Sequence, residues 1–330
     1  MKIAFFNTKA YESKFFDLVN QSHQHEIHYF SPRLNLESTA LVSDEAVVCA
    51  FVNDRLDEKV LIALKEKGVK LIALRCAGFN NVDLTCAKNI GLPIVRVPAY
   101  SPFAVAEHAV GLLQCLNRHI HRAHNRVREG DFSLNNLMGF DLHGKTVGVI
   151  GTGTIGKVFI RIMQGFGCRV LAYDPVQSQE CLSSGVIYTP LEQLFSQSDI
   201  ISLHCPLTPQ TEHLIDTQAL NMMKTGVTII NTSRGKLIDT AAVIQALKTS
   251  KIGLLGLDVY EEEEAVFFED LSESIIQDDQ LSRLLTFPNV LVTSHQAFFT
   301  KEAMQQIAQV SLSNISAFEK DGSLNNLIPM

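Results

Sequence analysis

The chain has 330 residues, of which 46% are hydrophobic, and this exceeds what one hydrophobic core usually organises, so we expect about two domains. Its 28 basic and 35 acidic residues give a net charge of −7 without any basic tract, which argues against a nucleic-acid or anionic-membrane partner. No apolar stretch is long enough to cross a bilayer and the first residues lack a signal-peptide pattern, so we expect a cytoplasmic protein that acts on a small molecule.

Short apolar runs alternate with helical patterns along the chain, and this alternation predicts an α/β fold with open parallel sheets. One series of runs ends before about residue 99, and a second begins after about residue 145. The expected strands are 3–6, 46–50, 71–74 and 94–97 in the first series, then 147–150, 170–173, 200–203, 227–230, 254–257 and 290–292 in the second.

Two helical patterns define the domain boundaries. The first starts at Ser101-Pro102, where Ser is a suitable N-cap and Pro fits the first turn. Its apolar face consists of Ala106, Ala109, Val110, Leu112, Leu113 and Leu116. The last pattern, 301–320, follows the second series of strands and can pack back onto the first domain. We therefore expect a discontinuous first domain of residues 1–100 plus 297–330, and a second domain of residues 101–296.

The cysteines and clustered histidines predict neither disulfides nor a metal site. The seven cysteines are odd in number, widely spaced and without a C-x-x-C motif, so we expect small buried hydrophobes. His119, His121 and His124 have no cysteine or carboxylate beside them at ligand spacing. We expect no bound metal, and these histidines fit a solvated or interfacial helix end.

A glycine-rich turn follows the expected strand 147–150. Gly151, Gly153 and Gly156 form a G-x-G-x-x-G pattern, and Asp174 ends the next apolar run at about the 20-residue spacing of a ribose-binding acid. Gly151 permits the tight turn, Gly153 lets the backbone approach a pyrophosphate, and Gly156 lets the helix pack on its strand. Because Asp174 disfavours a 2′-phosphate and no Arg or Lys follows it in residues 175–178, the sequence predicts NAD rather than NADP.

Three further motifs follow expected strands of the second series. Arg234 suits a two-point grip on a carboxylate, Glu263 belongs to an acidic run after Asp258, and His295 comes just after the strand 290–292. The acidic stretch 258–285 fits a long excursion at the carboxyl end of a strand, where ligands bind in open α/β sheets. Each charged residue alone is as readily a solvated surface group. Together with a dinucleotide turn, they are what hydride transfer to a 2-oxo acid requires.

At these motifs the chain resembles the D-isomer-specific 2-hydroxyacid dehydrogenases over nearly its whole length. Within that family it is most similar to the fermentative NAD-dependent D-lactate dehydrogenases, on the segments 7–9, 75–83, 98–102 and 266–270. The resemblance implies two Rossmann-like domains, one flavodoxin-like and one NAD-binding, with the active site in the cleft between them. The N-terminal third and the C-terminal helix would form the substrate domain.

The resemblance also implies catalytic roles. His295 would give a proton to the keto oxygen while nicotinamide C4 delivers hydride to C2, and the ordinary histidine pKa of about 6.5 suits both directions. Glu263 would hold His295 and favour its protonated form, and the Glu-x-Glu spacing selects Glu263 over Glu262 and Glu264. Arg234 would bind the substrate carboxylate and polarise the carbonyl.

Further residues would contact the substrate and the cofactor. The backbone N–H groups of Gly78 and Phe79 would help to hold the carboxylate, and Tyr100 and Phe298 would line a pocket that suits a methyl group. On the cofactor, Thr154 and Ile155 would meet the pyrophosphate, Cys205, Pro206 and Thr211 would flank the adenosine, and Thr232, Ser233 and Asp258 would approach the nicotinamide half. Thr154 stands where many relatives have Arg, Lys or His, so one phosphate contact is expected to be weaker.

Two alternatives stay open at this point. The substrate can be hydroxypyruvate, glyoxylate or a larger 2-oxo acid, because a few methylenes change selectivity by only about 1–3 kcal/mol. Some relatives instead act as NAD-sensing corepressors, but they carry extensions that this sequence does not show. The family further implies a homo-oligomer, dimer or tetramer, with the helix from Ser101 in a two-fold contact.

Overall fold

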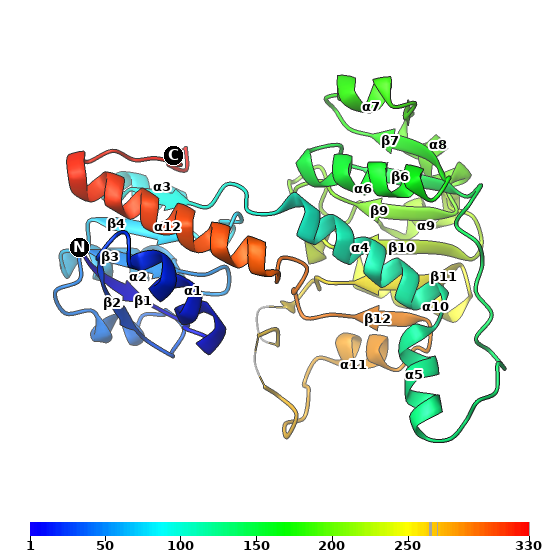
Figure 1. Ribbon diagram of the computed structural model, residues 1–330, viewed down its shortest axis with the longest axis horizontal. Helices are drawn as coiled ribbons and strands as arrows, with labels where there is room; N and C mark the ends of the chain where they lie inside the picture. Colours follow the sequence, from blue (N-terminus) through cyan, green and yellow to red (C-terminus); the bar gives the residue numbers. More distant parts are fainter. Residues whose placement is uncertain (264–265, 269, 330) are drawn as a thin grey trace. The chain divides into compact units, whose positions relative to one another are not determined.

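The computed structural model describes residues 1–263, 266–268 and 270–329. The chain divides into two compact units: unit 1 comprises Met1–Ser101 and Phe299–Met330, and unit 2 comprises Pro102–Phe298. Each unit contains one fully parallel sheet, which confirms the expected α/β class with two parallel-sheet domains (Figure 1). Glu264 and Glu269, which belong to the acidic run and to the segment 266–270, lie outside the described residues.

Unit 1 has a five-stranded sheet with the order β2-β1-β3-β4-β5, the flavodoxin-like arrangement. The helix α12 closes the unit by packing beside α1 and on β4, although more than two hundred residues separate it from both (Figure 1). The elements are β1 (Lys2–Phe5), α1 (Ala10–Asn20), β2 (Glu26–Tyr29), η1 (Ser38–Leu41), β3 (Val47–Ala50), α2 (Glu58–Glu66), β4 (Leu71–Leu74), α3 (Leu84–Asn89), β5 (Ile94–Arg96) and α12 (Lys301–Asp321).

Unit 2 has a seven-stranded sheet with the order β12-β11-β10-β9-β6-β7-β8. This is the Rossmann order with one extra strand. The strands after β6 are added on one side of it as far as β8, and from β9 onward on the other side. Dinucleotides bind in such sheets at this point, between β6 and β9. The elements are α4 (Pro102–Asn117), α5 (Ile120–Arg128), β6 (Thr146–Ile150), α6 (Thr154–Gly165), β7 (Arg169–Tyr173), α7 (Gln179–Ser183), β8 (Ile187–Tyr188), α8 (Leu191–Gln197), β9 (Ile200–Leu203), α9 (Thr217–Met222), β10 (Val227–Asn231), η2 (Gly235–Leu237), α10 (Thr240–Lys248), β11 (Ile252–Leu257), α11 (Asp279–Leu285) and β12 (Val290–Val292).

Both faces of the unit 2 sheet are covered by helices. Successive strand residues go to opposite cores: Ile200 packs with α4 and α6, whereas Ile201 packs with α8, α9 and α10. The expected apolar face of α4 lies in the first of these cores, so α4 is fixed against its own sheet. Strands buried on both faces read as continuous apolar runs, which is why the sequence reveals them.

Two strands escaped the sequence prediction, and both lie at a sheet edge. The strand β2 has the sequence Glu-Ile-His-Tyr and is half exposed, and β8 is a two-residue strand of Ile187 and Tyr188. Edge strands face water along one side, so they need no continuous apolar run. All ten expected strands are present within one or two residues of their predicted limits.

Side-chain caps fix where most helices begin. Asp57, Asp83, Asp216, Asp239 and Asp278 each accept a hydrogen bond from a backbone N–H three residues later. No helix in the described part of the chain is both long and apolar enough to span a membrane.

Candidate functional site

In the glycine turn after β6, the backbone at Gly151 and Gly156 is closely packed, whereas the backbone at Gly153 is open. Gly151 has a positive φ of 98°, and a Cβ there would lie 2.5 Å from the carbonyl carbon of His204. A Cβ on Gly156 would lie 2.0 Å from the Gly151 oxygen, whereas one on Gly153 would meet nothing within 4 Å. The backbone at Gly153 is therefore uncovered at the start of α6, which fits the approach of a pyrophosphate.

The first residues of α6 add free backbone donors to this turn. Thr154 is exposed and Ile155 half-buried, and the N–H groups at a helix start have no partner within the helix. Together with the positive end of the helix dipole, such donors favour an anionic ligand. His204 lies against the turn, and burial lowers its pKa to about 3, so this imidazole is neutral near neutral pH. The sequence patterns did not single out His204.

The carboxylate of Asp174 is bound to the same turn. Its Oδ2 accepts hydrogen bonds from the Thr152 N–H at 2.7 Å and from the Thr152 hydroxyl at 3.2 Å, and its Oδ1 accepts from the Val176 N–H at 2.9 Å. A carboxylate offers about four lone-pair positions, so Oδ1 can still accept from a ribose hydroxyl. A cavity of about 320 Å³ opens beside this carboxylate, lined by Tyr173, Asp174, Gln177, Tyr188, Thr189 and Pro190.

The loop after β9 follows the strand that neighbours β6 on the side opposite to β7. Burial raises the pKa of Cys205 to about 11, so its thiol stays protonated. The Thr211 hydroxyl donates to the Pro206 carbonyl at 2.7 Å and accepts from the Thr208 N–H at 2.8 Å. In the structure the Thr211 side chain thus stabilises the loop that begins at Cys205 and Pro206.

The segment after β10 positions Arg234. The Asn231 side chain donates to the Arg234 carbonyl at 2.9 Å, and the Ser233 hydroxyl donates to the Cys205 carbonyl at 2.7 Å. One guanidinium nitrogen of Arg234 donates to the Ser233 carbonyl at 2.7 Å. Among the described residues, no carboxylate forms an ion pair with this half-buried guanidinium. A cation in that setting favours an anionic ligand.

The buried hydroxyl of Thr232 also lacks a hydrogen-bond partner among the described residues. Thr232 lies in the segment expected at the nicotinamide half, and a polar group of a bound cofactor can satisfy this hydroxyl. The open glycine turn, the ordered Asp174 and the orphaned Thr232 hydroxyl therefore all fit NAD.

His295 and Glu263 form the central pair of the site. The Nδ1 atom of His295 lies 2.8 Å from Glu263 Oε1, and the other carboxylate oxygen accepts from the Tyr260 N–H at 2.9 Å. An ionised carboxylate only accepts, so Nδ1 carries a proton, and Nε2 is the ring nitrogen not used in this contact. His295 has a positive φ of 48°, a conformation that costs energy for a non-glycine residue and often marks a functional site.

The carboxylate of Asp258 anchors the loop that carries His295. Asp258 is fully buried and accepts from the Thr293 hydroxyl at 2.5 Å, the Gln296 N–H at 2.9 Å and the Ala297 N–H at 2.8 Å. His108 on α4 reaches the same group, with Nε2 3.0 Å from the Thr293 hydroxyl oxygen. The contact of Asp258 with nicotinamide that the resemblance implies remains a prediction.

A close backbone contact brings the Arg234 loop to the Glu263 segment. A Cβ on Gly235 would lie 2.0 Å from the Tyr260 oxygen, so only glycine permits this approach. Arg234, Asp258 and His295 follow β10, β11 and β12, which are neighbours in the sheet. The structure thus places the charged residues of three separate motifs at the carboxyl ends of three neighbouring strands in unit 2.

In unit 1, Gly78 and Phe79 lie in a loop after β4 that is held from both ends. Arg96 donates to the Ala77 carbonyl at 2.6 Å and stacks on the Phe79 ring with its guanidinium carbon 5.0 Å from the ring centre. Arg75, fully buried at the end of β4, pairs with Glu12 at 2.8 Å. Neither of these two contacts could be predicted from local sequence patterns, because in each the two partners belong to different segments of the chain.

Tyr100 is half-buried in unit 1, and Phe298 is buried in unit 2 directly after the loop that Asp258 anchors. Their expected contact with the substrate side chain remains a prediction. The seven cysteines form no disulfide with one another, and six of them are buried. The described residues include no group of three or more His, Cys, Asp or Glu side chains that could hold a metal ion.

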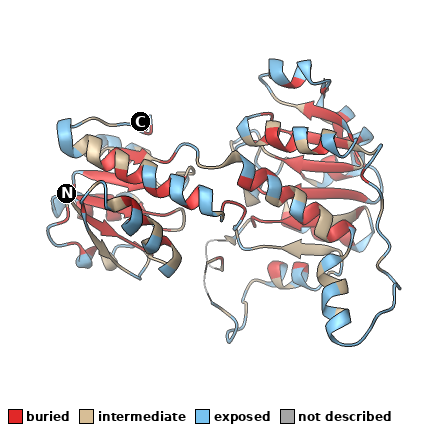
Figure 2. Cartoon of the chain, in the orientation of Figure 1, coloured by how far each residue is buried: buried red, intermediate tan, exposed pale blue. Residues whose placement is uncertain are grey.

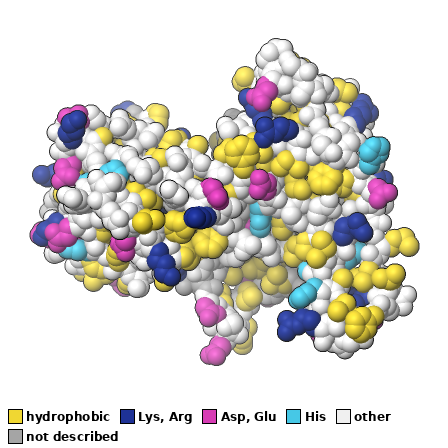
Figure 3. Space-filling view, viewed as in Figure 1, with side chains coloured by type: hydrophobic (Ala, Val, Ile, Leu, Met, Phe, Trp, Pro, Cys, Tyr) yellow, Lys and Arg dark blue, Asp and Glu magenta, His cyan; other side chains and the backbone are white. Residues whose placement is uncertain are grey.

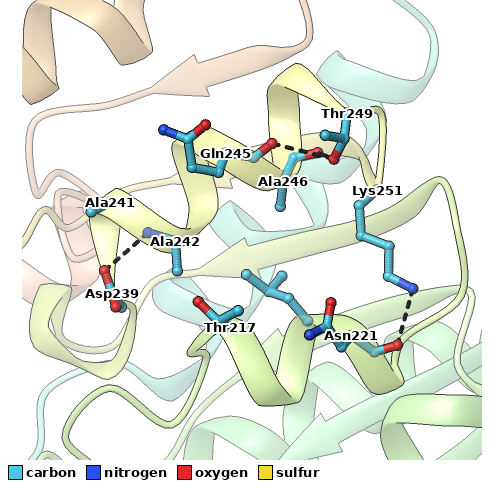
Figure 4. A pocket seen from close by; sticks show the side chains of 10 residues that line it. Thr217, Asn221, Asp239, Ala241, Ala242, Gln245, Ala246, Thr249 and Lys251 are labelled. Atoms are coloured by element: carbon cyan, nitrogen blue, oxygen red, sulfur yellow. Dashed lines mark hydrogen bonds between the residues drawn. The ribbon is translucent and has the colours of Figure 1, made fainter.

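A larger hollow of unit 2, about 550 Å³, lies between α9 and α10, away from these residues (Figure 4). Its polar groups serve the local backbone: Asp239 caps α10 through the Ala242 N–H at 3.0 Å, and the Lys251 ammonium donates to the Asn221 carbonyl at 3.3 Å. None of the predicted site residues lines this hollow, so the larger of these two cavities is not the candidate active site.

Comparison with known proteins agrees with this geometry. Residues 110–297 match the family model described as D-isomer specific 2-hydroxyacid dehydrogenase, NAD binding domain. The chain is 53% identical over 326 residues to the D-lactate dehydrogenase of Escherichia coli (strain K12), covering 99% of each chain. It superposes on the apo-structure of D-lactate dehydrogenase from Escherichia coli with a TM-score of 0.92 and 51% identity over 100% of both chains. D-lactate dehydrogenase with NAD+ from Lactobacillus jensenii gives a TM-score of 0.83 at 33% identity, again over 100% of both chains.

Proposed function

The chain belongs to the D-isomer-specific 2-hydroxyacid dehydrogenase family and uses NAD, and we propose that it is a D-lactate dehydrogenase that reversibly reduces pyruvate. The His295–Glu263 pair supports this proposal most strongly. It lies at the carboxyl ends of the strands of unit 2, as Arg234 does. The bound cofactor supplies the hydride, and the chain supplies a proton donor and a carboxylate anchor.

His295 provides the proton. With Nδ1 bonded to Glu263, its Nε2 atom holds the transferable proton at the keto oxygen, and the negative carboxylate stabilises the imidazolium form. Because the Tyr260 N–H fixes the other carboxylate oxygen, the ring is oriented before substrate arrives. In the reverse direction the neutral ring accepts the hydroxyl proton of D-lactate.

Arg234 provides the carboxylate anchor. Its fork geometry suits a two-point contact, and its guanidinium also stabilises negative charge that develops on the keto oxygen. We further propose that unit 1 is the substrate unit, with the N–H groups of Gly78 and Phe79 as additional donors to the carboxylate. Tyr100 and Phe298 would then surround the methyl group of pyruvate.

A panel of 2-oxo acids tests the choice of substrate. Initial rates with pyruvate, hydroxypyruvate, glyoxylate and 2-oxoisocaproate would be compared under NADH and under NADPH, with chiral analysis of each product. We expect pyruvate with NADH to give the highest kcat/KM and D-lactate as the product. A higher kcat/KM for another 2-oxo acid would replace pyruvate as substrate, and the L-isomer as product would overturn the proposal.

We also propose a homo-oligomer, in which the segment 120–138, here called the α5 arm, contacts another copy. The helix α5 has nine residues and none of them is buried (Figure 2), although isolated helices of that length are marginal in water. Phe132, Leu134 and Met138 expose 74%, 82% and 91% of their surface, and apolar and basic side chains gather on this part of unit 2 (Figure 3). A contact between copies would cover these apolar groups. The seven cysteines form no disulfide with one another, which is usual in a reducing compartment, and we propose the cytoplasm.

A further inference from the structure

A chain of four hydrogen-bonding groups leads from the edge strand β8 to the ribose-binding acid. The Ser178 N–H donates to the Tyr188 hydroxyl at 2.9 Å, and the Tyr188 hydroxyl donates to Thr152 Oγ1 at 2.9 Å. The Thr152 hydroxyl donates in turn to Asp174 Oδ2 at 3.2 Å. Tyr188 is one of the residues that escaped the sequence analysis, because β8 carries no apolar run.

The direction of this chain follows from its two ends. An ionised carboxylate only accepts, so the Thr152 hydroxyl must give its proton to Asp174. Its oxygen then needs a donor, and the Tyr188 hydroxyl is the group in reach. A backbone N–H only donates, so the Tyr188 hydroxyl oxygen accepts from the Ser178 N–H, and the hydroxyl proton is left for Thr152. Aligned hydrogen bonds of this kind strengthen one another, and here they all point at Asp174.

Burial raises the pKa of Tyr188, so its phenol keeps the proton that the chain requires at neutral pH. Tyr188 also lines the 320 Å³ cavity beside Asp174. The acid is therefore held from two sides: by the backbone N–H groups of Thr152 and Val176, and by the side-chain relay that starts at Tyr188.

We propose that Tyr188 is a positioning residue for cofactor selection, which acts through Thr152 to hold the Asp174 carboxylate toward the ribose hydroxyls of NAD. A carboxylate held in this way receives the 2′-hydroxyl of NADH and cannot turn away from the 2′-phosphate of NADPH, whose like charge is repelled. The inference rests on the family's use of NAD and is independent of whether pyruvate is the substrate.

Fluorescence titration gives the Kd of NADH and of NADPH without any turnover, so it tests the relay separately from the proposed reaction. The variants are Tyr188→Phe, Thr152→Val, the double variant, and Thr152→Ser, which keeps a hydroxyl in the relay. Tyr29→Phe is the matched control, because it removes a tyrosine hydroxyl that donates to Asp17 at 2.7 Å in unit 1.

Loss of one hydrogen bond in the relay should weaken NADH binding by about 3- to 10-fold in Tyr188→Phe and in Thr152→Val. NADPH binding should weaken less, so the ratio of the two Kd values narrows. The double variant should bind NADH no worse than Thr152→Val, because both changes interrupt one path. Thr152→Ser and Tyr29→Phe should keep the wild-type ratio of the two Kd values, and kcat at saturating NADH should stay near wild type in Tyr29→Phe.

An unchanged NADH Kd in Tyr188→Phe would overturn the proposal. So would a double variant whose loss is the product of the two single losses, since Tyr188 would then act independently of Thr152. If Tyr188→Phe fails to fold, the comparison of Thr152→Val with Thr152→Ser decides the matter: equal NADH Kd values in those two variants would also overturn it.

Discussion

Replacement of Glu263 by glutamine tests the proposed proton donor most directly. The wild-type carboxylate accepts from His295 with one oxygen and from the Tyr260 N–H with the other. Glutamine has one acceptor oxygen, so if that oxygen serves Tyr260, its NH₂ group faces His295 Nδ1. The ring then becomes a neutral tautomer that accepts at Nδ1, and the imidazolium loses its stabilising charge.

The size of the effect follows from the burial of the pair. The side chains of His295 and Glu263 are only 18% and 20% exposed, so water screens their contact weakly. A hydrogen bond to a charged group contributes about 1.5–3 kcal/mol, which corresponds to a loss of about 10- to 150-fold in rate. We expect kcat/KM for pyruvate to fall by that factor in Glu263→Gln, because His295 loses its charged hydrogen-bond partner.

Glu261→Gln is the matched control in the same acidic run. Glu261 also pairs with a histidine, His213, with a Nε2 to Oε1 distance of 2.6 Å, but neither residue belongs to the proposed catalytic group. Steady-state kinetics between pH 6 and 8, together with NADH titration, would compare the two variants. Glu261→Gln should keep kcat/KM within about threefold, because the Glu261–His213 pair contains no residue of the proposed catalytic group. Equal losses in the two variants, or none in Glu263→Gln, would refute the role assigned to Glu263.

Four further predictions concern the remaining parts of the site and the assembly. His295→Gln should lower pyruvate turnover by at least about 100-fold and keep the NADH Kd, and near-normal turnover would exclude His295 as the donor. Arg234→Lys should raise KM for pyruvate and lower kcat together, since an ammonium lacks the two aligned donors; a change in only one constant would contradict this. Asp174→Ala should narrow the preference for NADH over NADPH, and wild-type discrimination in that variant would place the selection elsewhere. Sedimentation should give a homo-oligomer that Leu134→Asp dissociates, whereas a wild-type monomer with full activity would remove the assembly.

Much of this protein could be predicted from the sequence because the relevant signals are local. Central parallel strands are buried on both faces, so each reads as one apolar run, and the glycine turn occupies six consecutive residues. The choice of Glu263 from a run of glutamates rested on motif spacing, and the structure places its carboxylate 2.8 Å from His295. The edge strand β8 gave no such signal, because water covers one side of it.

Only the tertiary structure decided which distant side chains support these motifs. Tyr188 and Thr152 are 36 residues apart, Thr293 and Asp258 are 35 apart, and His108 and Thr293 are 185 apart. Each contact exists because nearby parallel strands of one sheet have their carboxyl ends on the same side, or because α4 packs across that sheet. Strand order and helix packing arise from the whole core, so no local pattern of residues encodes these hydrogen bonds.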